Sequence, residues 1–258
     1  MNELRVENIT KSFKISKKQQ KNSKSNVDRI VALQDFSASF KEGEIYGLLG
    51  PNGAGKTTAL RIIASLIKAD SGEIYFNDKN IYDEIYFYRK KVGFLTSELK
   101  LDDFFTPDYT FTYMSRLYGL SEEETKANKE KLFNRFGISA FKDVKIHDLS
   151  TGMKQKVSLA ISLCNNPDVI IFDEPTNGLD IVASKDVEDY LLDLKKENKI
   201  IIISTHIFSI IEKLCDRVAI ILKGKKVLEG ELKEVIKDKS LDNVFFDLYY
   251  KEQGHEEY

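Results

Sequence analysis

Apolar residues follow two spacings along the chain, and the changes between them divide it into strands and helices. Residues 2–9 and 29–40 alternate apolar and polar positions, as half-buried strands do. Residues 44–49 form a short apolar run typical of a buried strand, and residues 59–67 place apolar side chains at helical spacing. The pattern therefore predicts two half-buried strands, then a buried strand that leads into a helix.

The rest of the chain continues this alternation around one long helical insertion. The predicted strands are 73–76, 91–95, 169–172, 200–204 and 218–222, and the predicted helices are 82–90, 153–164, 181–196 and 207–215. Residues 99–148 contain helical patterns only, and Ser121 to Glu124 form a capping box that opens a helix ending near residue 136. Strands that are apolar on both faces suit a buried parallel sheet. From residue 240 onward we expect a short amphipathic helix and a polar, frayed end.

Composition and charge fit a soluble α/β protein with no global attraction to nucleic acid. The 258 residues are 42% hydrophobic and 31% charged, with a formal net charge of -2. No apolar run exceeds about five residues, against about 20 for a membrane-spanning helix. The start of the sequence lacks the long apolar stretch of a secretion signal, so we expect a cytosolic chain.

Three local features receive structural interpretations. Residues 11–24 carry six lysines and no acid, which we interpret as a solvated loop, with lipid headgroup contact as the alternative. Cys164 and Cys215 are isolated in apolar surroundings, so we expect reduced core residues. The three histidines form no cluster with cysteines, so a structural metal is not expected.

A phosphate-loop pattern, G-x-x-x-x-G-K-[ST], lies between the buried strand at 44–49 and the following helix. Its residues are Gly50, Pro51, Asn52, Gly53, Ala54, Gly55, Lys56, Thr57 and Thr58. Gly53 and Gly55 let the backbone approach a ligand, so that successive N–H groups point at phosphate oxygens near the start of the helix. Lys56 supplies a cation for the β- and γ-phosphates, and the Thr57 hydroxyl is placed to bind Mg²⁺.

Further polar residues follow two of the predicted buried strands. Asp173 and Glu174 end the strand at 169–172, and His206 follows the next strand. In open α/β sheets, ligands bind at the carboxyl ends of strands. We expect Asp173 to hold Mg²⁺ directly or through water, Glu174 to accept a proton from an attacking water, and His206 to hydrogen-bond the γ-phosphate.

Four motifs together resemble the nucleotide-binding subunit of an ATP-binding cassette (ABC) transporter. They are the phosphate loop, Leu149-Ser150-Thr151-Gly152-Met153, Asp173-Glu174-Pro175-Thr176-Asn177-Gly178-Leu179-Asp180 and Thr205-His206. They follow the family's order and approximate spacing across residues 1–235. The resemblance implies one α/β domain, a P-loop NTPase with a parallel sheet and an N-terminal antiparallel β subdomain. Its predicted parts are a core at about 1–97 and 153–235, an inserted α-helical subdomain at about 98–152, and a C-terminal helical tail at about 236–258.

The resemblance also assigns roles across a head-to-tail dimer with two ATPs between the subunits. Phe13 matches the aromatic that stacks on adenine, and Glu174 matches the catalytic base. Ser150 and Gly152 match the signature that contacts the γ-phosphate bound by the partner subunit, and Asp180 matches the acid that crosses the interface. The partner is a second copy or a paralogue.

The family's mode of action implies further partners for this chain. Dimer closure on ATP would drive substrate export through a separate transmembrane permease docked on the helical segment 99–148. The resemblance therefore implies a peripheral subunit held by the permease at the cytoplasmic face of the membrane, with no nucleic acid partner.

Two departures and two alternatives accompany this interpretation. Ser97, followed by Glu98, stands where the family usually has a Gln sensor, so we expect altered coupling with ATP binding retained. The Ser-Thr-Gly-Met signature resembles subunits of small type-two export permeases, including sodium and drug extruders, but Met153 cannot make the polar contacts of the usual Gln. One alternative is a soluble ABC ATPase acting on ribosomes or nucleic acid; the other is a degenerate cassette that binds ATP without hydrolysing it.

Overall fold

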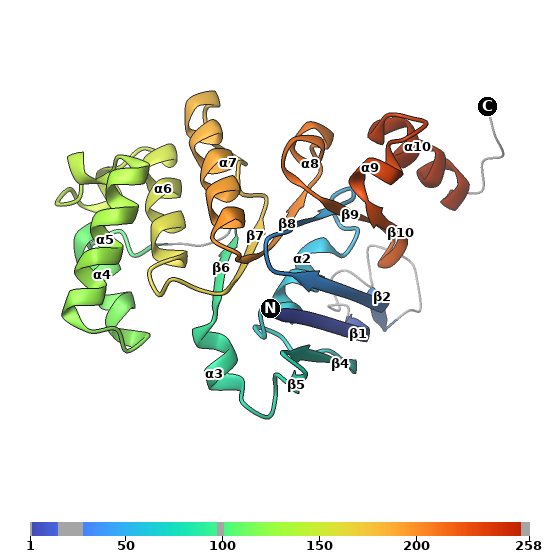
Figure 1. The fold of residues 1–258 in the computed structure, drawn as a ribbon, viewed down its shortest axis with the longest axis horizontal. Helices are drawn as coiled ribbons and strands as arrows, with labels where there is room; N and C mark the ends of the chain where they lie inside the picture. The colour runs from blue at the N-terminus through green and yellow to red at the C-terminus, as the bar shows by residue number, and fades with distance from the viewer. Residues whose placement is uncertain (1, 15–27, 97–100, 254–258) are drawn as a thin grey trace.

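The strands form two sheets in the computed structural model, which describes residues 2–14, 28–96 and 101–253. The first sheet has the strand order β2-β1-β4-β5 and the second has the order β10-β9-β3-β8-β7-β6 (Figure 1). The bounds are β1 (Glu3–Lys14), β2 (Arg29–Lys41), β3 (Ile45–Leu49), β4 (Ser71–Phe76), β5 (Lys79–Asn80), β6 (Val92–Thr96), β7 (Val169–Asp173), β8 (Ile200–Thr205), β9 (Arg217–Leu222) and β10 (Lys225–Glu231).

The second sheet is parallel except at β10, and its strands β3, β7 and β8 are buried along their full length. Isoleucine-rich runs that are apolar on both faces suit this position, because one face of the second sheet packs against helices and the other packs against the first sheet and the helix that follows the phosphate loop. The register aligns Leu49 with Thr205 and Asp173 with Ser204, so β3, β7 and β8 end side by side. The segments that leave these strands therefore meet at one edge of the sheet.

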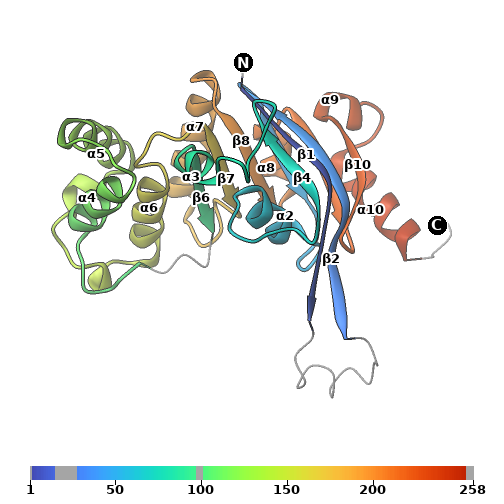
Figure 2. The ribbon, with the colours of Figure 1, turned by 90° about the horizontal axis from the view of Figure 1, so that it is seen from below.

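The first sheet is antiparallel, as predicted, but its leading hairpin is longer than the sequence pattern indicated. β1 continues to Lys14, and Phe13 pairs with Ile30 on β2. The interpretation of residues 11–24 as a loop is therefore wrong for 11–14, and the remainder of that segment lies outside the described residues. Asp70 explains the extension, because it accepts hydrogen bonds from Lys11 Nζ at 2.8 Å and from the Ser12 amide at 2.8 Å. The hairpin projects beyond the rest of the molecule (Figure 2).

The helices cover the second sheet and form a separate group at one end of the molecule. Their bounds are α2 (Lys56–Ile63), α3 (Ile85–Lys90), α4 (Pro107–Leu117), α5 (Glu122–Phe136), α6 (Thr151–Ser162), α7 (Ile181–Lys196), α8 (Phe208–Leu214), α9 (Leu232–Val235) and α10 (Leu241–Glu252), with 3₁₀ turns at Ile138–Ala140 and Ile146–Asp148. Helices α4, α5 and α6 pack together, and α6 also contacts β6 (Figure 1). Within the described ranges, no helix combines the length and apolar content needed to cross a membrane.

Several local predictions can be compared with these elements. The capping box is present, because Ser121 Oγ accepts from the Glu124 amide at 3.2 Å and a Glu124 carboxylate oxygen accepts from the Ser121 amide at 2.8 Å. Cys164 and Cys215 are buried and free, as expected. The short strand β5, the strand β10 and the helix α9 were not predicted, since β10 is a partly buried edge strand whose mixed side chains do not alternate cleanly.

Candidate nucleotide site

A cavity of about 300 Å³ lies at the carboxyl edge of the second sheet. Its lining residues are Ala32, Asn52, Gly53, Ala54, Gly55, Lys56, Thr57, Thr58, Thr96, Asp173, Glu174, Asn177 and His206. Most of the phosphate loop thus shares one cavity with the acids that follow β7 and the histidine that follows β8. The sequence placed these residues at the ends of strands, and the parallel register brings them together.

The phosphate loop needs glycine for two different reasons. Gly53 and Gly55 have φ angles of +79° and +111°, in the left-handed region that side-chain-bearing residues rarely adopt. At Gly50 and Gly55 the limit is space: a Cβ would lie 2.4 Å from the carbonyl oxygen of Ile221 or of Ala32, respectively. The backbone of the loop therefore packs against the backbone at Ile221 and Ala32, and α2 begins directly after the loop.

Lys56 is the first residue of α2 and is 5% exposed. Its Nζ donates to the carbonyl oxygens of Gly50 at 2.7 Å and Pro51 at 3.2 Å, and it lies 3.9 Å from a carboxylate oxygen of Glu174. Burial lowers the pKa of Lys56 from its usual value because desolvation disfavours the ammonium, while the Glu174 and Asp173 carboxylates act in the opposite direction. The loop thus holds a buried cation where phosphate oxygens would complete its partners.

Thr57 and Asp173 form the oxygen-rich part of the cavity. The Thr57 hydroxyl donates to Asp173 at 2.6 Å, and the Ser204 hydroxyl donates to the other oxygen of the same carboxylate. A hydroxyl that donates to a carboxylate keeps its lone pairs for a cation. Hydroxyl and carboxylate oxygens are the donors that Mg²⁺ prefers, so these residues fit the predicted magnesium ion.

Glu174 and His206 both line the cavity and contact each other, with Glu174 Oε1 and His206 Nδ1 2.9 Å apart. Glu174 has a φ of +57°, and its amide donates to the carbonyl oxygen of Ser204 at 3.0 Å. A left-handed glutamate is unusual and marks a turn that the surrounding structure holds in place. An ionised Glu174 accepts from Nδ1–H of His206, which leaves Nε2 of the imidazole for another partner.

The remaining predicted residues lie outside this cavity. Phe13 is on the β1–β2 hairpin, with its ring 5.7 Å from Lys11 Nζ. Ser150 caps α6 and accepts from the Met153 amide at 3.3 Å, and Asp180 caps α7 in the same way with a hydrogen bond of 2.8 Å from the Ala183 amide. A Cβ at Gly152 would meet no atom within 4 Å, so the signature is open at this position. Met153 packs against the core, which suits its apolar side chain.

Sequence reasoning missed four residues of the site: Ala32, Thr96, Asn177 and Ser204. Ser204 had a visible signal, because it interrupts an isoleucine run just before the strand ends. Asn177 lies within the quoted motif but received no role. Ala32 gave no signal, since it comes from a distant strand, where its backbone carbonyl lies against Gly55. Ser97 and Glu98 lie outside the described residues.

A glycine-rich loop that opens a helix and faces an Asp, a Glu and a His at the edge of a parallel sheet defines a P-loop nucleoside-triphosphate hydrolase. Comparison with known proteins narrows this class. A family model described as "ABC transporter" matches residues 33–177. ABC transporter ATP-binding protein NatA of Bacillus subtilis is 39% identical over 207 residues, which cover 80% of this chain and 84% of NatA.

Two further proteins resemble the chain. Nod factor export ATP-binding protein I of Burkholderia orbicola is 38% identical over 203 residues, covering 79% of this chain and 66% of that protein. The dimeric post-hydrolysis structure of the ATP-binding cassette MJ0796, bound to ADP and Pi, superposes with a TM-score of 0.77 at 27% identity, covering 89% of this chain and 98% of that chain. The chain therefore belongs to the family of ABC transporter ATP-binding proteins, and the predicted fold class and ATPase activity are confirmed.

Proposed function

We propose that this ATPase drives export through a separate transmembrane permease, by closing as a head-to-tail dimer on two Mg²⁺–ATP molecules. The observation that carries the proposal is that the predicted site residues fall into two groups at different places in the structure. Lys56, Glu174 and His206 line one cavity, whereas Ser150 and Asp180 start helices outside it. A second subunit would bring the second group to the nucleotide. The MJ0796 cassette is dimeric and one relative is named for Nod factor export, which supports both parts of the proposal.

The chain's own residues suggest how one half of the site works. Lys56 and the amides of the phosphate loop bind the phosphates, and Thr57 with Asp173 would hold Mg²⁺, which neutralises phosphate charge when bound. Glu174 accepts a proton from the attacking water. A doubly protonated His206 can hold Glu174 in place through Nδ1–H and donate to the γ-phosphate through Nε2–H. The Ser150 hydroxyl and the amides at the start of α6 are then free to serve the nucleotide of the other subunit.

Two exposed aliphatic residues support an interface next to Asp180. Ile181 and Val182 are 90% and 72% exposed at the start of α7. Such side chains at the start of a polar-capped helix suit burial against another subunit.

Replacing Ile181 with Asp is therefore expected to weaken the ATP-dependent dimer at least about tenfold, because the interface would have to desolvate a charge. Light scattering with ATP in a hydrolysis-deficient background measures the dimer, and calorimetry should show unchanged nucleotide affinity. Leu117→Asp is the matched control, since Leu117 is 62% exposed on α4. An unchanged dimer in Ile181→Asp would contradict the interface.

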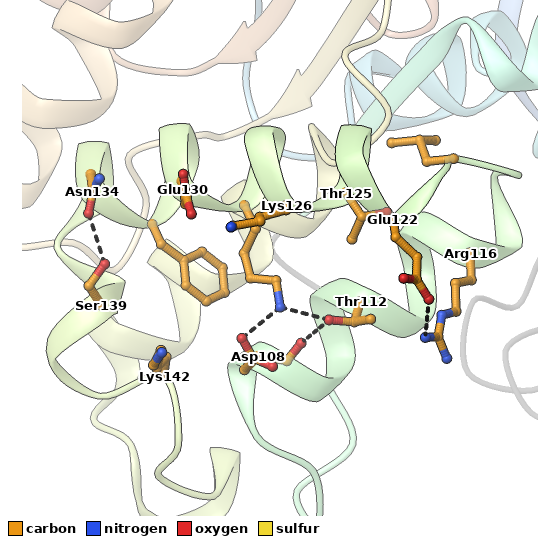
Figure 3. Close-up of a pocket in the computed structure, with 13 residues that line it drawn as sticks. Asp108, Thr112, Arg116, Glu122, Thr125, Lys126, Glu130, Asn134, Ser139 and Lys142 are labelled. Atoms are coloured by element: carbon orange, nitrogen blue, oxygen red, sulfur yellow. Dashed lines mark hydrogen bonds and ion pairs between the residues drawn. The ribbon is translucent and has the colours of Figure 1, made fainter.

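A second cavity of about 460 Å³ offers a docking site for the permease. It lies between α4 and α5, and Figure 3 shows its charged lining. Lys129 Nζ on α5 donates to Asp108 at 2.7 Å and to the Thr112 hydroxyl at 2.8 Å on α4, so these bonds join the two helices that flank the cleft. The Thr125 hydroxyl at this cleft is buried and has no hydrogen-bond partner among the described residues.

An exposed, mostly aromatic row lies next to this cleft, beginning just before α4 and continuing along that helix. Phe105, Tyr109, Tyr113 and Leu117 recur every four residues, and the rings of Tyr109 and Tyr113 stack with centroids 6.2 Å apart. Mixed charges beside an aromatic row suit an amphipathic helix from a partner protein. We propose that a cytoplasmic segment of the permease lies here.

Replacing Tyr113 with Glu is expected to reduce recovery of the subunit with its permease from detergent-solubilised membranes at least about fivefold, because interface tyrosines contribute strongly to binding. The ATP affinity of the isolated subunit should stay unchanged. Tyr250→Glu is the matched control, because Tyr250 on α10 is 52% exposed and Tyr113 is 51% exposed. Recovery without any membrane protein would refute the transport proposal itself, and equal loss in both variants would refute this docking site.

The proposal also covers location and domain boundaries. The permease would hold the subunit at the cytoplasmic face of the membrane. The core at about 1–97 and 153–235, the helical subdomain at about 98–152 and the tail from 236 remain our proposed divisions of a single domain. Helix α6 contacts α4, α5 and β6 and so joins the first two parts.

A further inference from the structure

The C-terminal helix α10 meets the turn after β9 through one lysine. Lys223 Nζ donates to the backbone carbonyl of Glu252 at 3.0 Å and to the side-chain oxygen of Gln253 at 3.3 Å. The last carbonyls of a helix lack partners within it, and the helix dipole places partial negative charge at that end. Lys223 therefore caps α10 from a distant part of the chain.

The residue after Lys223 holds the phosphate loop. The Gly224 amide donates to the carbonyl oxygen of Ala54 at 2.8 Å, and the Gly224 carbonyl accepts from the Gln34 amide on β2 at 2.8 Å. A Cβ on Gly55 would lie 3.5 Å from the Cα of Gly224. The turn is thus wedged between β2 and the phosphate loop.

Lys223 bridges a gap between α10 and the loop. A cavity of about 230 Å³ has Asn52 and Gly53 of the phosphate loop on one side, and Tyr249 and Gln253 of α10 on the other. Because this space separates the helix from the loop, the helix reaches the loop through the lysine and the adjoining Gly224. A displacement of the end of α10 would therefore be transmitted along this route.

A second contact of α10 involves a residue that follows His206 closely in the sequence. Phe245 is buried on α10, and its ring packs edge-on against Phe208 with centroids 5.3 Å apart. Phe208 begins α8, two residues after His206. One helix thus contacts both the segment that follows His206 and the turn that holds the phosphate loop.

We propose that Lys223 is a positioning residue for the nucleotide. Tied to the end of α10, it keeps Gly224 against Ala54 and holds the phosphate loop in the conformation that receives phosphates. Lys223 has a φ of +48°, which glycine would adopt more readily. The lysine supplies what glycine lacks, namely the bond to α10. This inference uses ATP binding but does not depend on the proposed dimer, permease or export.

The test compares Lys223→Met with Lys223→Arg in the full chain. Calorimetry with ADP and with a non-hydrolysable ATP analogue should show about fivefold weaker binding in Lys223→Met, the size expected for a charge at a helix end. The KM for ATP should rise by the same factor with kcat unchanged. Lys223→Arg keeps the donors and should bind normally. Lys225→Met is the control, because Lys225 is an exposed lysine two residues away on β10.

Two results would overturn the proposal. Unchanged affinity and KM in Lys223→Met, with a lower melting temperature, would make the lysine a cap for α10 alone. Equal weakening in Lys225→Met would assign the effect to net charge near the site. If Lys223→Met does not fold, Lys223→Gly takes its place, because it relaxes the turn while removing the same bond; normal nucleotide affinity in that variant would also overturn the proposal.

Discussion

The Lys56→Ala variant is expected to bind ATP and ADP at least about thirtyfold more weakly than the unmodified chain, because removing one member of a buried, hydrogen-bonded charge pair costs about 2 kcal/mol or more. Lys56 is 5% exposed and points into the phosphate loop, where its ammonium already contacts two carbonyl oxygens. Triphosphate oxygens would be its strongest partners. Titration calorimetry at constant salt measures the change.

A second substitution separates binding from folding. Lys56→Met keeps most of the side-chain volume but removes the charge, whose desolvation already lowers the pKa of Lys56. We expect this variant to lose nucleotide affinity like Lys56→Ala while remaining folded without nucleotide, which circular dichroism measures. Lys68→Ala, on the exposed surface after α2, is the control and should bind normally. Full affinity in Lys56→Met would remove Lys56 from the phosphate site.

The sequence was most informative where the chemistry is local. The phosphate loop combines a strand, glycines and a helix start within one continuous segment, so spacing alone predicted it. The structure adds the reason for each glycine: Gly53 and Gly55 need left-handed angles, whereas a side chain at Gly50 would collide with the Ile221 carbonyl. The need for left-handed angles can be expected from a loop pattern, but the lack of space at Gly50 depends on Ile221 of β9.

Contacts between distant strands explain what could not be predicted. Ser204 reaches the Asp173 carboxylate because β7 and β8 pair in one register, which alternation of apolar residues does not specify. Likewise, the extension of β1 to Lys14 depends on hydrogen bonds to Asp70, more than 50 residues away. The left-handed conformation of Glu174 has no signal in the motif, although it directs the carboxylate toward His206.

These long-range contacts also give the two acids different surroundings, which fit the separate roles that we propose for them. Both oxygens of Asp173 accept hydrogen bonds from hydroxyls, which suits a ligand held in one orientation beside Mg²⁺. Glu174 instead contacts the cation of Lys56 and the imidazole of His206, so its carboxylate faces the open cavity. Neighbouring acids in the sequence thus have different surroundings, and Glu174 is the better placed to receive a proton.

Replacing Glu174 with Gln is accordingly expected to slow ATP hydrolysis at least about a hundredfold, the lower range for loss of a general base. The amide has nearly the same shape but cannot accept the proton of an attacking water. Nucleotide affinity should be retained, since the phosphate contacts come from Lys56 and the loop amides. If the subunits close on ATP as proposed, the variant should accumulate an ATP-bound dimer, detectable by light scattering.

The control for this variant is a buried glutamate outside the site. Glu188 on α7 is 9% exposed and pairs with Lys213, so Glu188→Gln changes the same chemical group without touching the cavity. Its hydrolysis rate should match that of the unmodified chain. Rapid hydrolysis by Glu174→Gln would exclude Glu174 as the base. Slow hydrolysis without an ATP-bound dimer would support Glu174 as the base but contradict the proposed two-subunit site. The two results can be separated because dimer closure and proton transfer depend on different groups.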